Sequence, residues 1–471
     1  MNKDLTFDRK FGYEVWDKAR IDKAFEFAQG YKDFLSAYKT EREVVSWSKN
    51  QAEKQGFIGI DQCVDPKNKN RKIYSVNRGK SIVLGVFGQK PVVDGIQMIL
   101  AHVDAPRIDL KPMPLYESEK IAWLKTQYYG GIKKYQWPAV PLALHGTIVL
   151  TSGEKVEVLI GEDEADPVFT ITDLLPHLSR TQMEKKLDEA VAGEDLNIII
   201  GSRPRISKAK DEGEEKKEKD AVKLGVLELL NKKYGITEED FVSADLEIVP
   251  TGKARDLGFD ASLVGGYGQD DRICVYTALK ALLEVNDPVR PIMIILVDRE
   301  EIGSESNTGA LSSFIPDFVS EMLYLQTGTH DENLLRDCLT KSQALSADVT
   351  TGFDPDYSEV FDGKNTARIG AGVVLEKYTG RRGKSDTNEA TAEYLAKIRN
   401  IFNKNNILWQ TGGLGKVDLG GGGTIAMFLA RHNMDVVDAG PPLLSMHSPF
   451  EISSKIDLYA AFEAYKAFLS A

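Results

Sequence analysis

Residues 291–304, with the sequence PIMIILVDREEIGS, indicate the fold of this chain. The apolar run 292–297 is typical of a buried strand, and Glu300 and Glu301 follow its carboxyl end, where open α/β sheets place their sites. Taken alone, this pair is more typical of a solvated acidic turn, because Glu is usually a surface residue. Adjacent side chains point in different directions, however, so one carboxylate can hold a metal while its neighbour reaches a bound water.

Polar residues also follow a second predicted strand, over residues 96–101. This strand is followed by His102, and Asp104 comes two residues later. A lone histidine is more often a hydrogen-bonded structural residue than a ligand, but the His-x-Asp spacing lets Asp104 accept the second imidazole N–H and fix the tautomer. Asp348, near another predicted strand end, is as consistent with a strand-end cap as with a function.

The pattern along the chain predicts an α/β fold interrupted by a β-rich insert. Helical spacing predicts two helices within the first 60 residues, and Thr40 with Glu43 can form a capping box for the second. Residues 109–249 contain turn residues and alternating strands, and after residue 250 strands alternate with helices. We therefore predict a discontinuous α/β domain, 1–108 with 250–471, and an inserted β-rich domain, 109–249.

Further elements are predicted within these two domains. In the insert they are a hairpin after Ser152 and Gly153, a solvated charged loop over 208–219, and a helix containing Val222 and Leu230. In the α/β domain the predicted helices follow Asp271, cover 394–402, and begin at Thr424 and at Lys455. The predicted strands of that domain lie near Ala344, near Gly370 and at Ile407.

Composition excludes several classes of protein. The chain has 471 residues and a formal net charge of −12, whereas nucleic acids and membrane surfaces are usually bound by a basic face. Three cysteines without close spacing indicate neither a disulfide framework nor a cysteine-based zinc module, and they fit a reducing cytoplasm. No apolar run is long enough to cross a bilayer, and the first residues lack an apolar signal region. We expect a cytoplasmic protein with no nucleic-acid or membrane partner.

Five segments in order resemble the aspartyl aminopeptidase family, which includes vacuolar aminopeptidase I and belongs to a clan of co-catalytic di-zinc exopeptidases. They are AHVDAP (101–106), GQDDR (268–272), DREEIGS (298–304), SAD (346–348) and MHSP (446–449). The resemblance covers nearly the whole chain. It implies a mixed-sheet α/β di-zinc exopeptidase core with an inserted, barrel-like dimerisation domain, peptide substrates and self-association into a tetrahedral dodecamer.

The resemblance also implies a role for each residue of the site. It assigns His102 and Asp348 to one metal, Glu301 and His447 to the other, Asp270 to both as a bridge, Asp104 to the orientation of His102, and Glu300 to general-base catalysis. Two histidines and three carboxylates suit two Zn²⁺ ions, although Mn²⁺ or Co²⁺ also fit. Two divalent ions about 3.5–4 Å apart need a bridging carboxylate to offset their repulsion.

The sequence departs from the family pattern at one motif. Where aspartyl aminopeptidases usually have Leu-Asp-Asn, this chain has Gln269, Asp270 and Asp271, so the choice of bridge depends on the alignment and a preference for acidic substrates stays open. Lys384 is a candidate for binding an acidic side chain, but it is more typical of a surface lysine. The glycines at 420–423 lack a phosphate-loop pattern and fit close approach of a substrate backbone.

These observations predict a metal-dependent aminopeptidase that removes N-terminal residues from peptides. One alternative is a deacylase or carboxypeptidase on the same metal core, which would need a carboxylate-binding arginine. Another is a catalytically silent, metal-binding shell protein. Glu300 argues against the second alternative, because a structural metal site does not need a base beside a ligand.

Overall fold

Two compact units make up the chain in the computed structural model, which describes residues 5–63, 71–205 and 219–471. The first unit comprises residues 1–105, 253–446 and 450–471, and the second comprises 106–252 and 447–449. The predicted division into a discontinuous domain, 1–108 with 250–471, and an inserted domain, 109–249, stays a prediction. Among the described residues, no helix combines the length and apolar character needed to cross a membrane.

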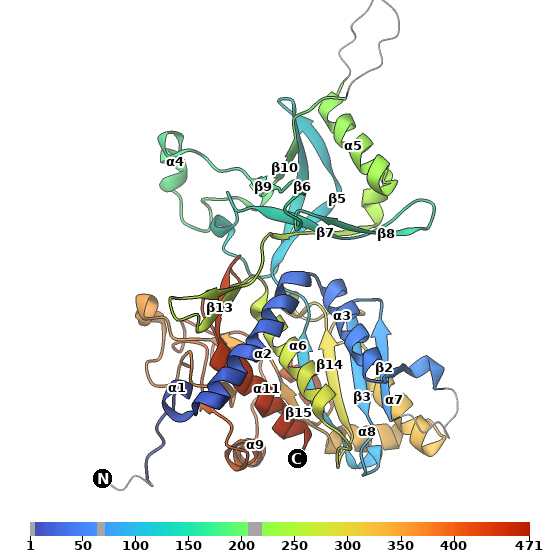
Figure 1. Ribbon diagram of the computed structural model, residues 1–471, viewed down its shortest axis with the longest axis vertical. Coiled ribbons are helices and arrows are strands. Elements are labelled where there is room, and N and C mark those ends of the chain that lie inside the picture. The colour runs from blue at the N-terminus through green and yellow to red at the C-terminus, as the bar shows by residue number, and fades with distance from the viewer. Residues whose placement is uncertain (1–4, 64–70, 206–218) are drawn as a thin grey trace, which may run out of the picture. The chain divides into compact units, whose positions relative to one another are not determined.

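A nine-stranded mixed sheet forms the core of the first unit (Figure 1). The central strands β14, β4, β15 and β19 are parallel, whereas β3 pairs antiparallel with β14 and β17 pairs antiparallel with β19. This confirms the predicted mixed α/β sheet. In spatial order the strands are β1 (Ile58–Gly59), β2 (Lys72–Asn77), β3 (Ser81–Val86), β14 (Ile292–Val297), β4 (Gln97–His102), β15 (Gln343–Ser346), β19 (Asp435–Gly440), β17 (Val373–Glu376) and β18 (Trp409–Thr411).

Alternate residues of the central strands pack into two different apolar clusters. Ile294 and Leu296 belong to a cluster with α2, α3, α6, α9 and α11, whereas Met293 and Ile295 belong to a cluster with α7, α8 and α10. Successive side chains of a strand point to opposite faces, so both faces of the sheet are covered. The helices of this unit are α1 (Gly12–Val15), α2 (Lys18–Ala37), α3 (Glu41–Lys54), α6 (Gln269–Glu284), α7 (Phe314–Thr327), α8 (Glu332–Lys341), α9 (Ala392–Lys404), α10 (Ala426–Ala430) and α11 (Lys455–Leu469).

The predicted capping box begins helix α3. The Glu43 N–H donates to Thr40 Oγ1 at 3.4 Å, and the Thr40 N–H donates to Glu43 Oε2 at 3.0 Å. These bonds satisfy backbone donors that a helix start leaves without an intrahelical partner. The two predicted N-terminal helices are therefore confirmed as α2 and α3.

The second unit contains a seven-stranded antiparallel sheet that curls on itself. Phe169, next to β9 at one end of the sheet, exchanges two backbone hydrogen bonds of 2.8 Å with Leu142 of β7 near the other end. This curled sheet confirms the β-rich, barrel-like character of the insert and its hairpin β7–β8. In spatial order the strands are β8 (Lys155–Ile160), β7 (Leu142–Val149), β11 (Ala244–Pro250), β5 (Arg107–Ser118), β6 (Ile121–Tyr129), β10 (Ile198–Gly201) and β9 (Thr170–Ile171).

The described residues of the second unit form two helices, α4 (Arg180–Met183) and α5 (Ala221–Tyr234). Helix α5 is the one predicted around Val222 and Leu230. The charged segment 208–219 lies, except for its last residue, outside the described residues. Five short strands complete the described part of the chain: β12 (Arg255–Leu257), β13 (Leu263–Gly266) and β21 (Glu451–Ser454) form one small sheet, and β16 (Thr350–Thr351) pairs with β20 (Pro442–Leu443).

Three predicted elements begin later than the sequence pattern suggested. The strand predicted at Ile407 begins at Trp409, because the Ile407 N–H still donates to the Phe402 carbonyl at the end of α9. The strand predicted near Gly370 begins at Val373, after a glycine at 372 with φ of 87°. The helix predicted from Thr424 covers only Ala426–Ala430, because the glycines before it favour irregular backbone.

A buried carboxyl group in β17 predicts a pH-dependent stability. Burial raises the pKa of Glu376 to about 7, although its hydrogen bond from Thr350 lowers it. The folded chain therefore keeps a proton that the unfolded chain loses, and stability falls as the pH rises from about 4.5 to 7. Glu376→Gln should raise the free energy of unfolding by roughly 2–3 kcal/mol at pH 8 and by almost nothing at pH 5. Denaturant titrations at both pH values test this, and an equal effect at both would contradict it.

Candidate metal centre

Three neighbouring parallel strands end at one edge of the sheet, and predicted site residues follow each of them. His102 is the last residue of β4, Glu300 and Glu301 begin a short 3-10 helix (Glu300–Ile302) after β14, and Asp348 follows β15. Parallel strands present their carboxyl ends on the same side, so these residues come together although they are far apart in sequence. Asp270 and Asp271 lie in the first turn of α6, which packs against the same strands.

The two ring nitrogens of His102 face different carboxylates. Nδ1 lies 3.0 Å from the carbonyl oxygen and 3.3 Å from Oδ1 of Asp104. Nε2 lies 3.1 Å from Asp270 Oδ1 and 3.8 Å from Asp348 Oδ1. With Nδ1 donating toward Asp104, Nε2 carries the lone pair that a metal binds, on the side of the two predicted ligands.

Two overlapping sets of side chains have ligand atoms within 4.8 Å of one another. One set contains His102, Asp271 and Asp348, and the other contains His102, Asp270 and Glu301. Both adjacent aspartates thus lie at ligand distance, and a cis peptide bond joins them. Asp271 Oδ2 also accepts the backbone N–H of His102 at 3.3 Å, a bond by which Asp271 supports the end of β4.

Asp104 contacts other parts of the site besides His102, its predicted partner. Its carboxylate accepts the backbone N–H of Glu300 at 3.1 Å and that of Glu301 at 3.2 Å, one on each oxygen. Asp104 is fully buried, so these bonds are shielded from water. One side chain therefore fixes the ring of His102 and the backbone of both glutamates.

The buried carboxyl groups at this edge of the sheet favour a bound cation. Burial is the largest influence on the pKa of His102 and lowers it, but hydrogen bonds to Asp104 and Asp270 raise this pKa well above its ordinary value overall. Burial raises the pKa of Asp348 strongly, and the charge of Glu300 raises it further. Burial also raises the pKa of Asp271 well above the usual range. Buried carboxylates of this kind keep their protons unless positive charge compensates them.

This donor set fits divalent zinc. The imidazole and the carboxylates supply the nitrogen and oxygen donors that zinc binds, and bound metal takes the place of the protons that the carboxylates would otherwise retain. His102 and Asp270 are at most 3% exposed, which gives the low local dielectric in which a fixed charge acts strongly. The residues present therefore fit the metal chemistry that the sequence predicts.

His447 lies among residues of the second unit. Residues 447–449 group with that unit, and His447 Nδ1 is 2.9 Å from the Gly131 carbonyl oxygen. An Nδ1–H donor to this carbonyl leaves the Nε2 lone pair for a metal. The role of His447 as a ligand stays a prediction.

Other residues singled out in the sequence have structural partners. Lys384 forms an ion pair of 3.0 Å with Glu389, and both side chains are more than 40% exposed. Thr424, which follows the glycines at 420–423, donates to Asp438 Oδ1 at 2.7 Å. Lys384 and Thr424 therefore have partners within the chain.

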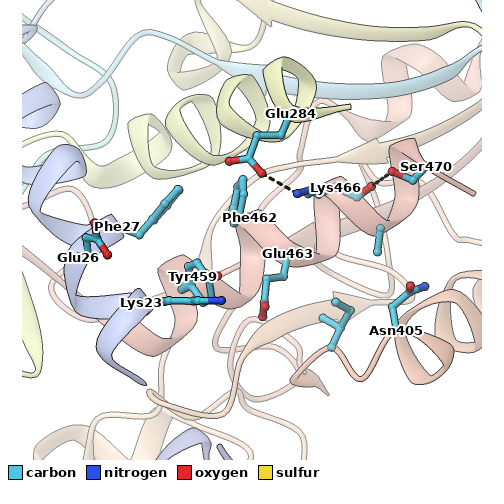
Figure 2. Close-up of a pocket in the computed structure, with 12 residues that line it drawn as sticks. Lys23, Glu26, Phe27, Glu284, Asn405, Tyr459, Phe462, Glu463, Lys466 and Ser470 are labelled. Carbon is cyan, nitrogen blue, oxygen red and sulfur yellow. Dashed lines mark hydrogen bonds and ion pairs between the residues drawn. The ribbon is translucent and has the colours of Figure 1, made fainter. Parts of the chain in front are cut away.

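A cavity of about 690 Å³ among α2, α6 and α11 contains none of the predicted site residues. Figure 2 shows its aromatic side chains, Phe27, Tyr459 and Phe462, and the ion pair of Glu284 with Lys466, which is 2.6 Å long. The metal centre is therefore defined by its side-chain chemistry rather than by this cavity.

Sequence reasoning missed one acidic neighbour of the centre. Asp298, the residue directly after β14, is buried and accepts a hydrogen bond of 2.9 Å from Thr308 Oγ1. Burial, together with the charges of Glu41 and Asp104, raises the pKa of Asp298 to about 7. Its place directly after an apolar strand was the available signal.

Comparisons with known proteins identify the family and the fold. The family model described as Aminopeptidase I zinc metalloprotease (M18) matches residues 34–469. A probable M18 family aminopeptidase 1 of Clostridium acetobutylicum is 48% identical over 100% of both chains. The crystal structure of an M18 family aminopeptidase from Thermotoga maritima has a TM-score of 0.92 at 44% identity, over 99% of this chain and 100% of that one. The S. cerevisiae mApe1 dodecamer, at 21% identity over 96% of this chain and 97% of that one, has a TM-score of 0.74 and shares the fold.

Proposed function

The chain belongs to the aminopeptidase I zinc metalloprotease family (M18), and from this premise we propose how its residues divide the work of peptide hydrolysis. The protein is a metal-dependent aminopeptidase, a hydrolase that removes N-terminal residues from peptides. We assign His102 and Asp348 to one divalent ion, Glu301 and His447 to a second, Asp270 to both, and Glu300 to proton transfer. Two zinc ions per chain are part of this proposal.

One observation carries the assignment: Asp270 lies beside His102, assigned to one ion, and beside Glu301, assigned to the other. Asp270 and Asp348 both face Nε2 of the same imidazole, and Glu301 shares a set with Asp270. A carboxylate between the ligands of two neighbouring ions can serve as their common ligand. We choose Asp270 over Asp271 as that common ligand, because Asp271 already accepts the backbone N–H of His102.

The role of Glu300 follows from its position. Bound divalent ions would polarise the peptide carbonyl and lower the pKa of a water molecule. Glu300 is next to a ligand, its backbone is fixed by Asp104, and its charge acts on Asp348. Its carboxylate can therefore accept the proton of the attacking water and later donate it to the leaving amine, as general-base and general-acid catalysis require.

A substrate panel tests the function and the alternatives together. We expect the protein to release the first residue from aminoacyl anilides and free peptides, to lose this activity to a chelator, and to regain it with Zn²⁺, Mn²⁺ or Co²⁺. N-acetylated peptides of the same sequence are the control, and they should stay intact. Release of C-terminal residues or of the acetyl group would favour the carboxypeptidase or deacylase instead. The same panel would identify the preferred side chain.

We also propose that the protein self-associates through its second unit, as a tetrahedral dodecamer. Five large apolar side chains within one segment of that unit are at least half exposed: Leu174, Leu175, Leu178, Met183 and Leu187. Apolar clusters at a surface are typical of interaction sites. A double variant, Leu178→Asp with Met183→Asp, should lower the mass measured by light scattering, whereas the parent should remain assembled at micromolar concentration. A monomeric parent would contradict the proposal.

A cytoplasmic location completes the proposal. Cys63, Cys274 and Cys338 are all free and buried, which supports a reducing compartment. Cell fractionation, with antibody detection of the protein, would test it. Recovery mainly in an oxidising compartment would contradict it.

A further inference from the structure

Glu451 contacts the backbone that leads into helix α6. It is the first residue of β21 and is 1% exposed. Its Oε2 atom accepts the N–H of Gln269 at 2.5 Å and the N–H of Asp270 at 3.2 Å. One carboxylate oxygen thus binds two successive backbone donors, the second belonging to a residue of the metal centre.

The side chain of Gln269 fastens the same turn to β21. Its Nε2 donates to the carbonyl of Glu451 at 2.7 Å and to that of Val264 at 3.1 Å. Its Oε1 accepts from Ser453 Oγ at 2.5 Å and from the Tyr31 hydroxyl at 3.3 Å. The glutamine at which this chain departs from the family pattern is therefore hydrogen-bonded at both ends of its amide.

We propose that Glu451 is a positioning residue for the metal centre, which holds the main chain of Asp270 so that its carboxylate stays beside His102 and Glu301. The inference rests on the proposed function, in which Asp270 is the ligand shared by both ions. Neither Glu451 nor Gln269 is expected to touch substrate or metal.

Repulsion among the carboxylates explains why Asp270 needs such an anchor. The carboxylates of Asp270, Asp271 and Asp348 all lie at ligand distance from His102, so their negative charges repel one another before a metal binds. A main chain fixed by charge-assisted hydrogen bonds keeps the carboxylate in place against this repulsion. Asp104 does the same for Glu300 and Glu301, so two buried acceptors pre-organise both acidic segments of the centre.

Zinc affinity, measured by competition with a chromophoric chelator, tests the proposal. Glu451→Met keeps the length of the side chain and removes the acceptor, and it should weaken zinc binding by about 10–100-fold, the usual cost of losing a group that supports a ligand. Glu451→Gln keeps one carbonyl oxygen for the two N–H groups, so its loss should be smaller, about 3–10-fold. In the steady state kcat should fall with occupancy and recover in excess zinc, while KM changes little.

Asp457 provides a matched control within the same unit. It is fully buried, and its carboxylate accepts the N–H of Gly370 at 2.7 Å and that of Gly372 at 2.6 Å, away from the metal centre. Asp457→Leu and Asp457→Asn should lower the thermal unfolding temperature as the Glu451 variants do, yet leave zinc affinity within about 2-fold of the parent. Equal weakening by both pairs of variants would show a general loss of stability and overturn the proposal.

The remaining outcomes are also decisive. Parent-like zinc affinity in folded Glu451→Met would overturn the proposal, and if that variant does not fold, parent-like affinity in Glu451→Gln would do so. Asp270→Asn, measured alongside, separates this inference from the function on which it rests. If Asp270→Asn retains zinc, the assignment of Asp270 fails; if Asp270→Asn loses zinc while the Glu451 variants do not, only the anchoring role fails.

Discussion

Glu300→Gln is expected to lower kcat by about 10⁴-fold while both metal ions stay bound, because the amide cannot accept a proton. The substitution keeps the size of the side chain, and the backbone N–H at 300 still donates to Asp104. One proton carrier serves both the attack of water and the departure of the amine, so the loss should reach the upper end of general-base effects. Substrate binding should change little, so the loss should appear in kcat rather than KM.

The adjacent residue supplies the control for this experiment. Glu301→Gln removes a charged ligand rather than a base, so metal content should fall and part of the activity should return in excess metal. Steady-state assays and metal analysis on the same samples distinguish the two variants. A fully metallated Glu300→Gln protein with near-normal kcat would remove Glu300 from the mechanism.

Asp270→Asn is expected to weaken metal binding at both sites by at least about 100-fold. This loss exceeds the loss expected when a group that only supports a ligand is removed. The reason is its proposed double role, since a shared carboxylate would offset the repulsion between two ions as well as bind each. Metal analysis after dialysis against a weak chelator should find two ions per parent chain and few in the variant.

Asp271→Asn is the comparison that tests which of the two adjacent aspartates is the shared ligand. The amide oxygen of an asparagine can still accept the backbone N–H of His102, so both ions should remain bound. The structure makes this comparison sharp, because Asp271 also lies at ligand distance from His102 and Asp348. Loss of metal from Asp271→Asn but not from Asp270→Asn would exchange the roles of the two aspartates.

Local signals allowed much of the sheet to be predicted. The apolar run 292–297 became β14, and the capping box of Thr40 and Glu43 begins α3. His102, predicted to follow a strand, is the last residue of β4. Patterns of this kind depend on neighbours in sequence, and they therefore locate elements and the residues that end them.

The parts that were not predictable depend on contacts between distant segments. Asp104 was expected to act on His102 alone, whereas its oxygens also bind the backbone at 300 and 301, which no local pattern indicates. Glu451 and Gln269 are linked in the same way, across 182 positions of sequence. The start of β18 at Trp409 was misplaced because the backbone bond from Ile407 back to α9 decides it.

The pairing of β4 with β14 has a consequence for how the chain acquires its metals. His102 pairs with Val297, and the whole segment 106–252 of the second unit lies between these strands in sequence. Closing so long a loop is costly in chain entropy and is slow, so the ligands meet only after the centre of the sheet has formed. If zinc binds the folded chain and not the unfolded one, free zinc at about 100 times the Kd of one site would stabilise the folded state by about 2.7 kcal/mol. We therefore expect zinc supply to affect the lifetime of the folded chain as well as its rate of catalysis. We also expect refolding to begin without zinc and the ion to bind in the last step.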